Sequence, residues 1–399
     1  MSACGENNTS ARPSSPPEAV THSVPHVLHV ASGDLWAGAE AQIYEIAKAL
    51  HERDDVAVSA VILNPGRLAI NLTNAGIPTS IVDESRMTSW QILRCLVKLI
   101  STNRPDIVHT HRQKENILGA LAATWSRIPS IRTVHGGREF NWHILRADKK
   151  AIAAADWIVG RYLQRRILAV SEALAGDLAS RFPPAKIAVV RNGINVERIR
   201  ASVRRRSPGP HQDRALELCF SGRLVPVKRV DRLLDCLRIL LDRQPNKFNL
   251  TIVGDGPERE RLETYAGILG VAGSVHFLGY CQDSISVLDG CDLLLLASEH
   301  EGLPMTVLEA LSLGVPVVAP PVGGIPELVE AANFGKIARS GSSADLADAV
   351  LQVCGTANSR SPRQSRLPPG WTAETTTDQL VSLYKQVCRA AGRDLAVSE

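Results

Sequence analysis

Short apolar runs alternate with amphipathic stretches along most of the chain. Residues 24–31 form a nearly continuous apolar run, which is typical of a parallel strand buried on both faces. Residues 39–51 follow with helical spacing, because Ile43, Ile46 and Leu50 fall on one face of a 3.6-residue period. The pattern therefore begins with a strand, a loop and a helix.

The same alternation continues in two series. In the first half the strand candidates are 56–63, 77–82, 106–111, 130–135, 167–171 and 187–191, with helices at 90–100 and 117–125. In the second half they are 216–221, 249–254, 275–278, 292–297 and 315–319, with helices at 230–241, 257–269 and 306–313. Repeated β–α alternation predicts parallel sheets that bind ligands at the carboxyl ends of their strands. The expected fold is α/β, with two Rossmann-like parallel-sheet domains facing each other across a cleft.

Breaks in this pattern predict the domain boundaries. Residues 1–23 are rich in Ser, Pro, Asn and Thr and predict a disordered N-terminal extension. The cluster of Arg, Pro and Gly within 200–214 is typical of a linker. We therefore expect a first domain over 24–199, a second over 215–370, and a final segment over 371–399 whose helix spans about 373–389.

Composition narrows the class of protein. Aromatic residues make up only 4% of the 399, too few for the stacking surfaces that bind single-stranded nucleic acid, so no nucleic-acid partner is expected. The eight cysteines include no CxxC pair and lie mostly among apolar neighbours, which favours a reducing compartment. No apolar run approaches the roughly 18 residues of a membrane span. We expect a cytoplasmic protein, with any membrane contact peripheral and at the inner face.

Charge is distributed unevenly along the chain. Residues 25–205 contain 25 Lys and Arg against 16 Asp and Glu, whereas residues 206–399 contain 19 against 23. Ordinary surface variation explains this equally well. The alternative is that the first half meets an anionic membrane or a phosphate-bearing acceptor. On a helix, Arg161, Arg165 and Arg166 would line a membrane-facing or merely solvated side.

The segment 298–310 is the strongest candidate for chemistry. A buried strand leads into a loop with Glu301 and Gly302, and Pro304 suits the first turn of a helix that contains Glu309. The N-terminus of that helix would favour a phosphate, and the two carboxylates would lie on either side of it. The alternative is a capping acid and a solvated helical Glu.

A basic loop follows the first strand of the second domain. Gly222 would let the backbone approach a ligand, Arg223 would hold phosphate oxygens bidentately, and Lys228 would supply a point charge. Alone, such a loop is also compatible with an ordinary surface. Combined with the two acids of segment 298–310, it predicts a diphosphate site between the domains.

Two further loops have glycines where a ligand would approach. Gly33 and Gly38 lie between the first strand and first helix, but the loop lacks the GxGxxG spacing of a dinucleotide site. It cradles an anionic group or is a plain βα turn. Gly254 lies in a tight strand-to-helix turn that also lacks the third glycine of that fingerprint.

Histidines end two of the predicted strands. His135 at a strand tip would face the cleft and donate a hydrogen bond to a sugar hydroxyl, although a lone histidine is usually structural. His109 and His111 share one strand face and would be half a metal site, but no third ligand of suitable spacing is nearby. We therefore favour structural or supporting roles for both and predict no metal.

These features, in this order, resemble glycosyltransferase family 4, the group 1 retaining glycosyltransferases with a GT-B fold. The resemblance spans roughly residues 25–389 and rests on the following segments: Gly38-Ala-Glu40, Asp106-Ile-Val-His-Thr-His111, Thr133-Val-His135-Gly136, Ala169-Val-Ser171-Glu172, Asn192-Gly193-Ile194, Gly222-Arg223 to Lys228, Gly254-Asp-Gly256-Pro257, the Glu301–Glu309 spacing and Val322-Gly-Gly-Ile-Pro-Glu327.

The resemblance implies roles for individual residues. Arg223 and Lys228 would hold the donor diphosphate, Glu309 the ribose hydroxyls, and Glu301 and His135 the donor sugar. The remaining residues expected around the nucleotide are Gly222, Gly254, Leu278, Gly302, Leu303, Pro304 and Thr306. Gly33 and Gly38 would line the acceptor side, where Ala37 replaces a glycine that many relatives have. The last helix would cross back to the first domain.

The resemblance also implies an activity. We expect retaining, metal-independent transfer of a hexose-type sugar from a nucleoside-diphosphate sugar, by family frequency a UDP-sugar, to a saccharide or lipid-linked acceptor. Synthesis of cell-envelope polysaccharide, lipopolysaccharide or glycolipid would use such an enzyme. A nucleotide-sugar epimerase on the same fold and a non-catalytic nucleotide-sugar-binding protein are the alternatives.

Overall fold

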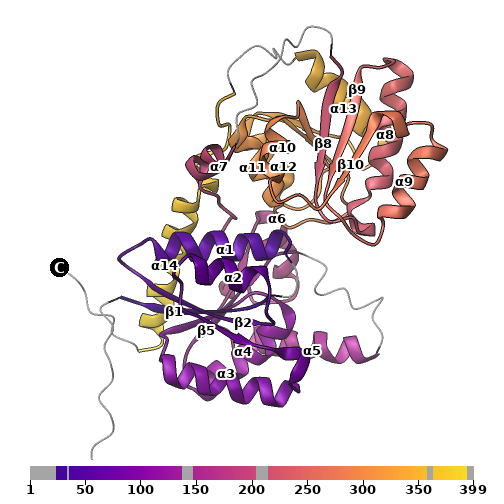
Figure 1. Ribbon diagram of the computed structural model, residues 1–399. Helices are drawn as coiled ribbons and strands as arrows, with labels where there is room; N and C mark the ends of the chain where they lie inside the picture. The colour runs from indigo at the N-terminus through magenta and orange to yellow at the C-terminus, as the bar shows by residue number, and fades with distance from the viewer. Residues whose placement is uncertain (1–23, 34–35, 137–146, 204–213, 357–362, 393–399) are drawn as a thin grey trace, which may run out of the picture.

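The computed structural model describes residues 24–33, 36–136, 147–203, 214–356 and 363–392. Two all-parallel sheets form two α/β domains, with strand orders β3-β2-β1-β4-β5-β6-β7 and β10-β9-β8-β11-β12-β13 (Figure 1). The prediction of two parallel-sheet domains is confirmed. The expected N-terminal extension and most of the expected linker lie outside the described residues.

The N-terminal domain follows the predicted alternation. Its strands are β1 (His26–Ser32), β2 (Ala57–Leu63), β3 (Thr79–Val82), β4 (Ile107–Thr110), β5 (Ser130–Val134), β6 (Arg166–Ala169) and β7 (Ile187–Val189). Its helices are α1 (Gly38–His51), α2 (Arg67–Asn74), α3 (Ser89–Asn103), α4 (Gln113–Trp125), α5 (Ala147–Tyr162) and α6 (Glu172–Ala179). Helices α3, α4 and α5 lie on the opposite side of the sheet from α1 and α2 (Figure 1).

The C-terminal domain has the same architecture. Its strands are β8 (Leu216–Ser221), β9 (Phe248–Val253), β10 (Val275–Gly279), β11 (Leu293–Leu295), β12 (Val317–Ala319) and β13 (Gly335–Ile337). Its helices are α8 (Val230–Arg243), α9 (Arg259–Ile268), α10 (Ser284–Asp289), α11 (Met305–Leu313), α12 (Ile325–Ala332) and α13 (Ser343–Thr356). A short helix between the two sheets, α7 (Val196–Ser202), packs against α10 and α11.

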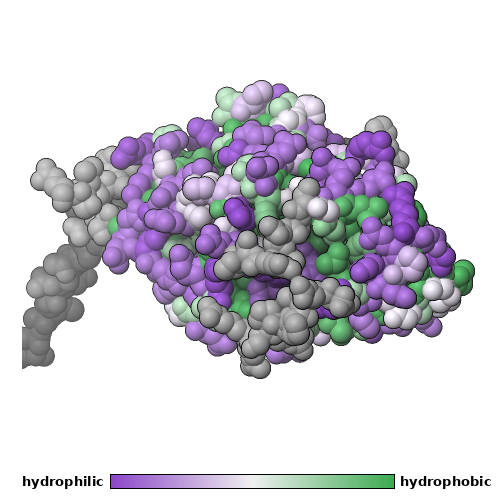
Figure 2. Space-filling view, turned by 90° about the horizontal axis from the view of Figure 1, so that it is seen from above, coloured by the Kyte–Doolittle hydropathy of each residue, from purple (hydrophilic) through white to green (hydrophobic). Residues whose placement is uncertain are grey.

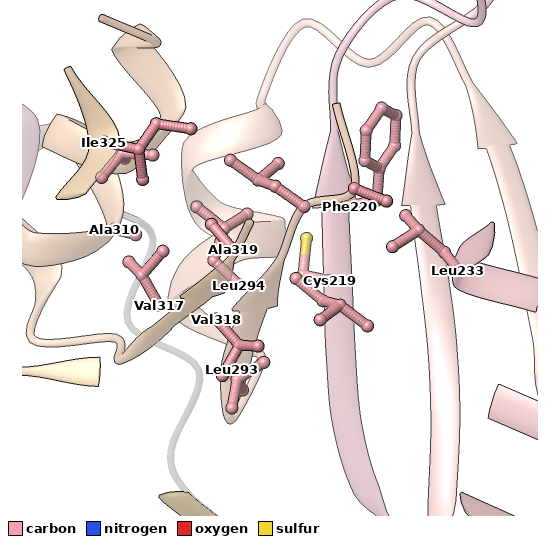
Figure 3. Close-up of a cluster of buried hydrophobic side chains, with 14 of the residues drawn as sticks. Cys219, Phe220, Leu233, Leu293, Leu294, Ala310, Val317, Val318, Ala319 and Ile325 are labelled. Atoms are coloured by element: carbon pink, nitrogen blue, oxygen red, sulfur yellow. The ribbon is translucent and has the colours of Figure 1, made fainter. Parts of the chain in front are cut away.

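An apolar core fixes the strand that leads into the segment 298–310. Leu294 of β11 is fully buried between β8 and β12, together with Phe220 and Val318 (Figure 3). Ala310 of α11 and Ile325 of α12 belong to the same buried cluster. Each large aliphatic or aromatic side chain buried in this way stabilises the fold by about 1.5–3 kcal/mol. The start of α11 is therefore held by the core of its domain.

The last helix, α14 (Ala373–Ala390), packs on the N-terminal domain, as predicted. Leu380 and Tyr384 are buried in one cluster with Ile46 and Leu50 of α1. Arg53 forms an ion pair with Asp378 at 2.6 Å, which adds a polar contact at the edge of the packed face. The end of the chain therefore completes the core of its first domain.

Two segments meet where the chain passes between the domains. Ile194 donates its N–H to the carbonyl of Trp371 at 3.2 Å, and Ala373 donates to the carbonyl of Ile194 at 2.9 Å. A Cβ on Gly193 would lie 2.2 Å from the carbonyl oxygen of Thr372, so this approach requires glycine.

A buried ion pair anchors α5 to the N-terminal sheet. The guanidinium of Arg132 on β5 lies 2.8 Å from the carboxylate of Asp156 on α5, and both side chains are fully buried. Arg132 also donates to the carbonyl of Asp156 at 3.0 Å. A Cβ on Gly160 would lie 2.9 Å from Arg132, so the glycine makes room for the guanidinium.

The arginines near residue 165 do not line one helix, contrary to expectation. Helix α5 ends at Tyr162, and Arg166 is the first residue of β6. Arg161 lies over the rings of Trp157 and Tyr162, with 5.7 Å to each ring centroid. The error arises because the run of polar residues at 161–166 continues the charge pattern across a helix end.

The described helices are too short or too polar for any of them to cross a membrane. Seen from above, the surface is largely hydrophilic, and its apolar residues form separate patches (Figure 2).

We expect Asp156→Ala to lower the free energy of unfolding by about 3–5 kcal/mol, because it leaves the buried guanidinium of Arg132 without its partner. Urea denaturation of the full chain would measure the loss. The matched control is Asp242→Ala, which breaks the exposed Arg238–Asp242 pair on α8 and is expected to change the free energy by at most about 0.5 kcal/mol. Equal effects of the two substitutions would contradict the anchoring role.

Candidate functional site

Helix α11 begins at Met305, one residue before the helical stretch expected at 306–313 and one residue after Pro304, which was expected in the first turn. Pro304 is the N-cap of α11, with extended backbone (φ −66°, ψ 132°), rather than a residue of its first turn. The reason is that ψ of Pro304 is not helical, although its φ suits a helix. None of the described side chains caps this end of α11. Its first N–H groups and positive dipole end are therefore open to an anion.

The structure brings the basic loop and the acidic segment into direct contact. The ammonium of Lys228 lies 2.5 Å from Glu301, and both side chains are largely buried. The next residue, Arg229, pairs instead with Asp231 and Glu299 and so serves the local fold. Arg223 is exposed and, within the described part of the chain, forms no ion pair. Lys228 and Arg223 thus differ: one is already paired, the other free.

Glu309 lies inside α11, about 1.4 turns beyond the N-cap Pro304. Burial raises the pKa of its carboxyl to about 7, with no hydrogen bond to it among the described residues. Thr306 is half-buried on the same helix, and Leu303 is buried beneath the loop. A desolvated carboxyl of this kind lacks hydrogen-bond donors around it. A polar ligand that donates hydrogen bonds would supply them and favour the ionised form.

The glycines of the second domain bring two loops together. Gly254 has φ +129°, and a Cβ there would lie 2.0 Å from the carbonyl oxygen of Gly222. Gly222 donates to the carbonyl of Val253 at 2.9 Å. These contacts explain why residue 254 needs glycine, whereas a Cβ on Gly222 would meet only the ring of Phe220, at 3.3 Å. Leu278, at the end of edge strand β10, is 49% exposed and offers an apolar surface to a ligand.

His135 and Gly302 form a contact between the domains. A Cβ on Gly302 would lie 1.9 Å from the carbonyl oxygen of His135, which directly follows β5. Burial, and secondarily the charge of Arg112, lower the pKa of His135 to about 3, so its ring is neutral. Nearby, Asn192 donates to the carbonyl of Leu303 at 2.9 Å. The structure thus places His135 beside the loop of Glu301.

Two of the expected site residues lie in the first loop, whose residues 34 and 35 fall outside the described part. A Cβ on Gly33 would lie 2.5 Å from Ile62, so this glycine serves close packing with β2. A Cβ on Gly38, by contrast, would meet nothing within 4 Å. Ala37 is extended (φ −138°), a conformation that any residue adopts, so its departure from the family pattern causes no strain. The start of α1 is fixed by the buried Glu40, which pairs with Arg112.

The structure supplies the third histidine that the sequence analysis judged absent. Ligand atoms of His29, His109 and His111 lie within 4.8 Å of one another, because β1 and β4 are adjacent strands. All three are fully buried. His29 bonds His111 at 2.9 Å, and His109 bonds Tyr384 at 2.8 Å and Thr133 at 2.7 Å. One hydrogen bond between imidazoles and two hydrogen bonds to hydroxyls hold this cluster together.

Sequence reasoning missed two of these groups. His29 was available, because in a doubly wound sheet the first and fourth strands are neighbours and His29 pairs in register with His109. Tyr384 gave no such signal, because it reaches His109 from α14, at the far end of the chain.

Two family models match the chain. The model described as Glycosyltransferase Family 4 matches residues 36–198, and the model described as Glycosyl transferases group 1 matches residues 204–362. Together the matches span most of both domains.

Curated relatives match part of the chain. An uncharacterised glycosyltransferase of Methanocaldococcus jannaschii is 30% identical over 58% of this chain and 62% of its own length. A D-inositol 3-phosphate glycosyltransferase of Streptomyces bingchenggensis is 31% identical over 61% of this chain and 57% of its own length. The matches thus span about six tenths of the length of these relatives.

Solved structures match nearly all of this chain. Anabaena HepE in complex with UDP and glucose has a TM-score of 0.74 at 21% identity, over 91% of this chain and 100% of that one. Sucrose-phosphate synthase of Thermosynechococcus elongatus has a TM-score of 0.71 at 15% identity, over 92% and 100%. At these identities the likeness shows the fold. The two family matches, over residues 36–198 and 204–362, show that the chain belongs to the family 4, or group 1, glycosyltransferases.

Proposed function

We propose that the protein is a retaining hexosyltransferase that moves a sugar from a UDP-sugar to a saccharide or lipid-linked acceptor, in the synthesis of cell-envelope polysaccharide, lipopolysaccharide or glycolipid. The observation that carries the proposal is the Lys228–Glu301 contact at the uncapped N-terminus of α11, where Gly302 meets the carbonyl of His135. A cation, a carboxylate and a helix N-terminus of the C-terminal domain therefore lie close to the end of β5 in the N-terminal domain.

The donor diphosphate is proposed to bind between Lys228, Arg223 and the N-terminus of α11. In the free protein Glu301 neutralises Lys228 at 2.5 Å. A phosphate would replace the carboxylate as the partner of Lys228, and Glu301 would then accept a hydrogen bond from a sugar hydroxyl. The exposed guanidinium of Arg223 needs no existing contact to be broken.

These groups suit a front-face transfer with retention. The bond between the anomeric carbon and the phosphate oxygen breaks, and the acceptor oxygen bonds to the same face of the sugar. The acceptor's proton passes to the departing phosphate, whose negative charge Lys228, Arg223 and the helix dipole stabilise. Because these positive groups perform the task that a metal has in other transferases, we propose metal-independent chemistry.

The nucleoside is proposed to lie along the outer side of α11. The half-buried Glu309, whose carboxyl has a raised pKa, would accept hydrogen bonds from the ribose hydroxyls. Leu278 would contact the base with its exposed side chain. Uridine is supported by the fold match to HepE, which was solved with UDP and glucose.

The acceptor is proposed to meet the N-terminal domain and to be anionic or membrane-borne. Arg112 and Lys114 follow β4 at the carboxyl end of the sheet, where an anionic group would compete with their present partners Glu40 and Glu84, and the space beside Gly38 is open. Several relatives are named D-inositol 3-phosphate glycosyltransferases, and a phosphate on the acceptor would be compatible with this basic edge.

One face of the N-terminal domain supports contact with an anionic membrane. Helices α3, α4 and α5 pack side by side. They expose the following large apolar residues: Trp90, Leu121, Trp125, Ile152, Ile158 and Tyr162. Among their described side chains the two acids, Glu115 and Asp156, are buried, whereas Arg94, Lys98 and Lys150 are exposed. Aromatic and basic residues on such a face favour peripheral binding.

We expect Lys228→Ala to weaken UDP binding by roughly 10- to 150-fold, the effect of losing about 1.5–3 kcal/mol from one charge-assisted contact. Calorimetric titration with UDP would measure it. Arg238→Ala, which removes an exposed, ion-paired arginine from the same domain, is the matched control and should bind UDP normally. Unchanged affinity in Lys228→Ala would exclude the proposed diphosphate site.

The affinity for UDP-glucose is expected to rise with pH through about 7, because Glu309 accepts from both ribose hydroxyls only when ionised. Its folded-state pKa lies above the ordinary 4.5, so ionisation destabilises the free protein increasingly as the pH rises, and the bound hydroxyls offset this. Titrations from about pH 5.5 to 8.5 should show the rise in the natural protein and not in Glu309→Gln. A rise of equal size in both would assign the dependence to another group.

A nucleotide-sugar epimerase or a binding protein on this fold would behave differently. A thermal-shift screen with UDP, GDP and their sugars should raise the melting temperature, because ligand at 100 times its Kd adds about 2.7 kcal/mol. An enzyme that converts its nucleotide sugar to an epimer without any acceptor would refute the transferase proposal. The absence of any shift would refute nucleotide binding itself.

A further inference from the structure

Three histidines on neighbouring strands form a hydrogen-bonded chain that ends at the candidate site. His29 lies on β1, His111 directly follows β4, and His135 directly follows β5. Nδ1 of His29 lies 2.9 Å from Nε2 of His111, and Nδ1 of His111 lies 3.3 Å from Nε2 of His135. The rings of His29 and His111 are stacked, with 9° between their planes. The chain therefore runs from the core of the N-terminal domain to the loop of Gly302.

Every ring in this chain is neutral. Burial lowers the pKa of His29 to about 4 and that of His135 to about 3, and it lowers the pKa of His111 well below its ordinary value. A neutral imidazole has one N–H and one bare nitrogen. Because His111 is bonded through both nitrogens, it donates from one and accepts on the other. The protons of all three rings must therefore point the same way along the chain.

The two ends of the chain decide the direction. Nε2 of His29 and Nδ1 of His135 are both buried, and neither has a partner among the described residues. If the protons pointed toward His29, an N–H would be trapped without an acceptor in the core, which is rare in folded proteins. If they point toward His135, the core keeps only a bare nitrogen. The N–H then lies on Nδ1 of His135, which is buried without a partner among the described residues but belongs to a half-exposed residue beside the loop of Gly302, where a ligand oxygen could accept from it.

We propose that His29 and His111 are positioning residues that fix the proton of His135 on Nδ1, so that its neutral ring presents an N–H to a hydroxyl oxygen of the donor sugar. The contact with the sugar rests on the proposed function. The position of the proton does not, because it is a property of the ligand-free protein.

His109 belongs to the same cluster but not to the chain. Its ring lies 4.4 Å from that of His111, yet its own nitrogens bond the hydroxyls of Tyr384 and Thr133. It is equally buried. His109→Gln therefore makes a matched control: it perturbs the packing of the cluster without breaking the chain.

Nitrogen NMR of the ligand-free full chain, labelled with ¹⁵N-histidine, distinguishes the two neutral forms of each ring. The signals missing from His135→Asn identify His135. The natural protein is expected to have His135 protonated on Nδ1. His111→Phe is expected to move that proton to Nε2, because Nε2 loses its donor. His111→Asn, whose amide N–H₂ can still donate, and His109→Gln are expected to leave it on Nδ1.

A natural protein with His135 protonated on Nε2, or on both nitrogens, would overturn the proposal without reference to any variant. So would an Nδ1 proton that survives in a folded His111→Phe. Since the spectra contain no donor or acceptor, failure of the transferase proposal would leave these outcomes unaffected, and failure here would leave the UDP titrations unaffected.

Discussion

The contact between Gly302 and the carbonyl oxygen of His135 holds the candidate site together. A Cβ at residue 302 would lie 1.9 Å from that oxygen, so only glycine lets the loop of one domain touch the strand tip of the other. The surrounding backbone supports this contact: Gly324 donates to the carbonyl of Gly302 at 2.6 Å, and Asn192 donates to that of Leu303. Because these segments pack against each other, the groups proposed to bind the phosphate and those proposed to bind the sugar have set positions relative to each other.

The charges around this contact are arranged in two ways. Lys228 and Glu301 neutralise each other, which avoids leaving either charge buried and alone. Glu309 instead keeps a raised pKa, because burial removes water from its carboxyl and no described residue replaces it. The first arrangement stabilises the empty site. The second leaves Glu309 with a carboxyl whose ionisation a hydrogen-bonding ligand would favour.

Much of the fold was predictable from the sequence, because buried parallel strands appear as short apolar runs and the helices between them as amphipathic stretches. The same rule located the loop of Glu301, at the end of β11. It missed the short helices α2, α6, α7 and α10, and it missed α12 and α13, which pack against β13 (Gly335–Ile337), a strand too short to stand out. It also placed Pro304 inside a helix, since φ alone is fixed by proline and ψ is set by the neighbouring loop. Contacts between distant segments, such as that of His109 with Tyr384, are not indicated by the pattern of apolar residues along the sequence. Their prediction requires strand order and the path of the last helix.

The position of α14 has a consequence for the way the chain is made. Leu380, Tyr384 and Val387 fill the core beside α1, yet they leave the ribosome after the whole of the C-terminal domain. The domain that is synthesised first is therefore completed last. Until then the apolar surface of Ile46 and Leu50 stays uncovered, and a nascent chain stopped after β13 would expose it to chaperones and proteases. The core of the N-terminal domain is thus completed only when both domains have been synthesised, because its last helix lies C-terminal to them.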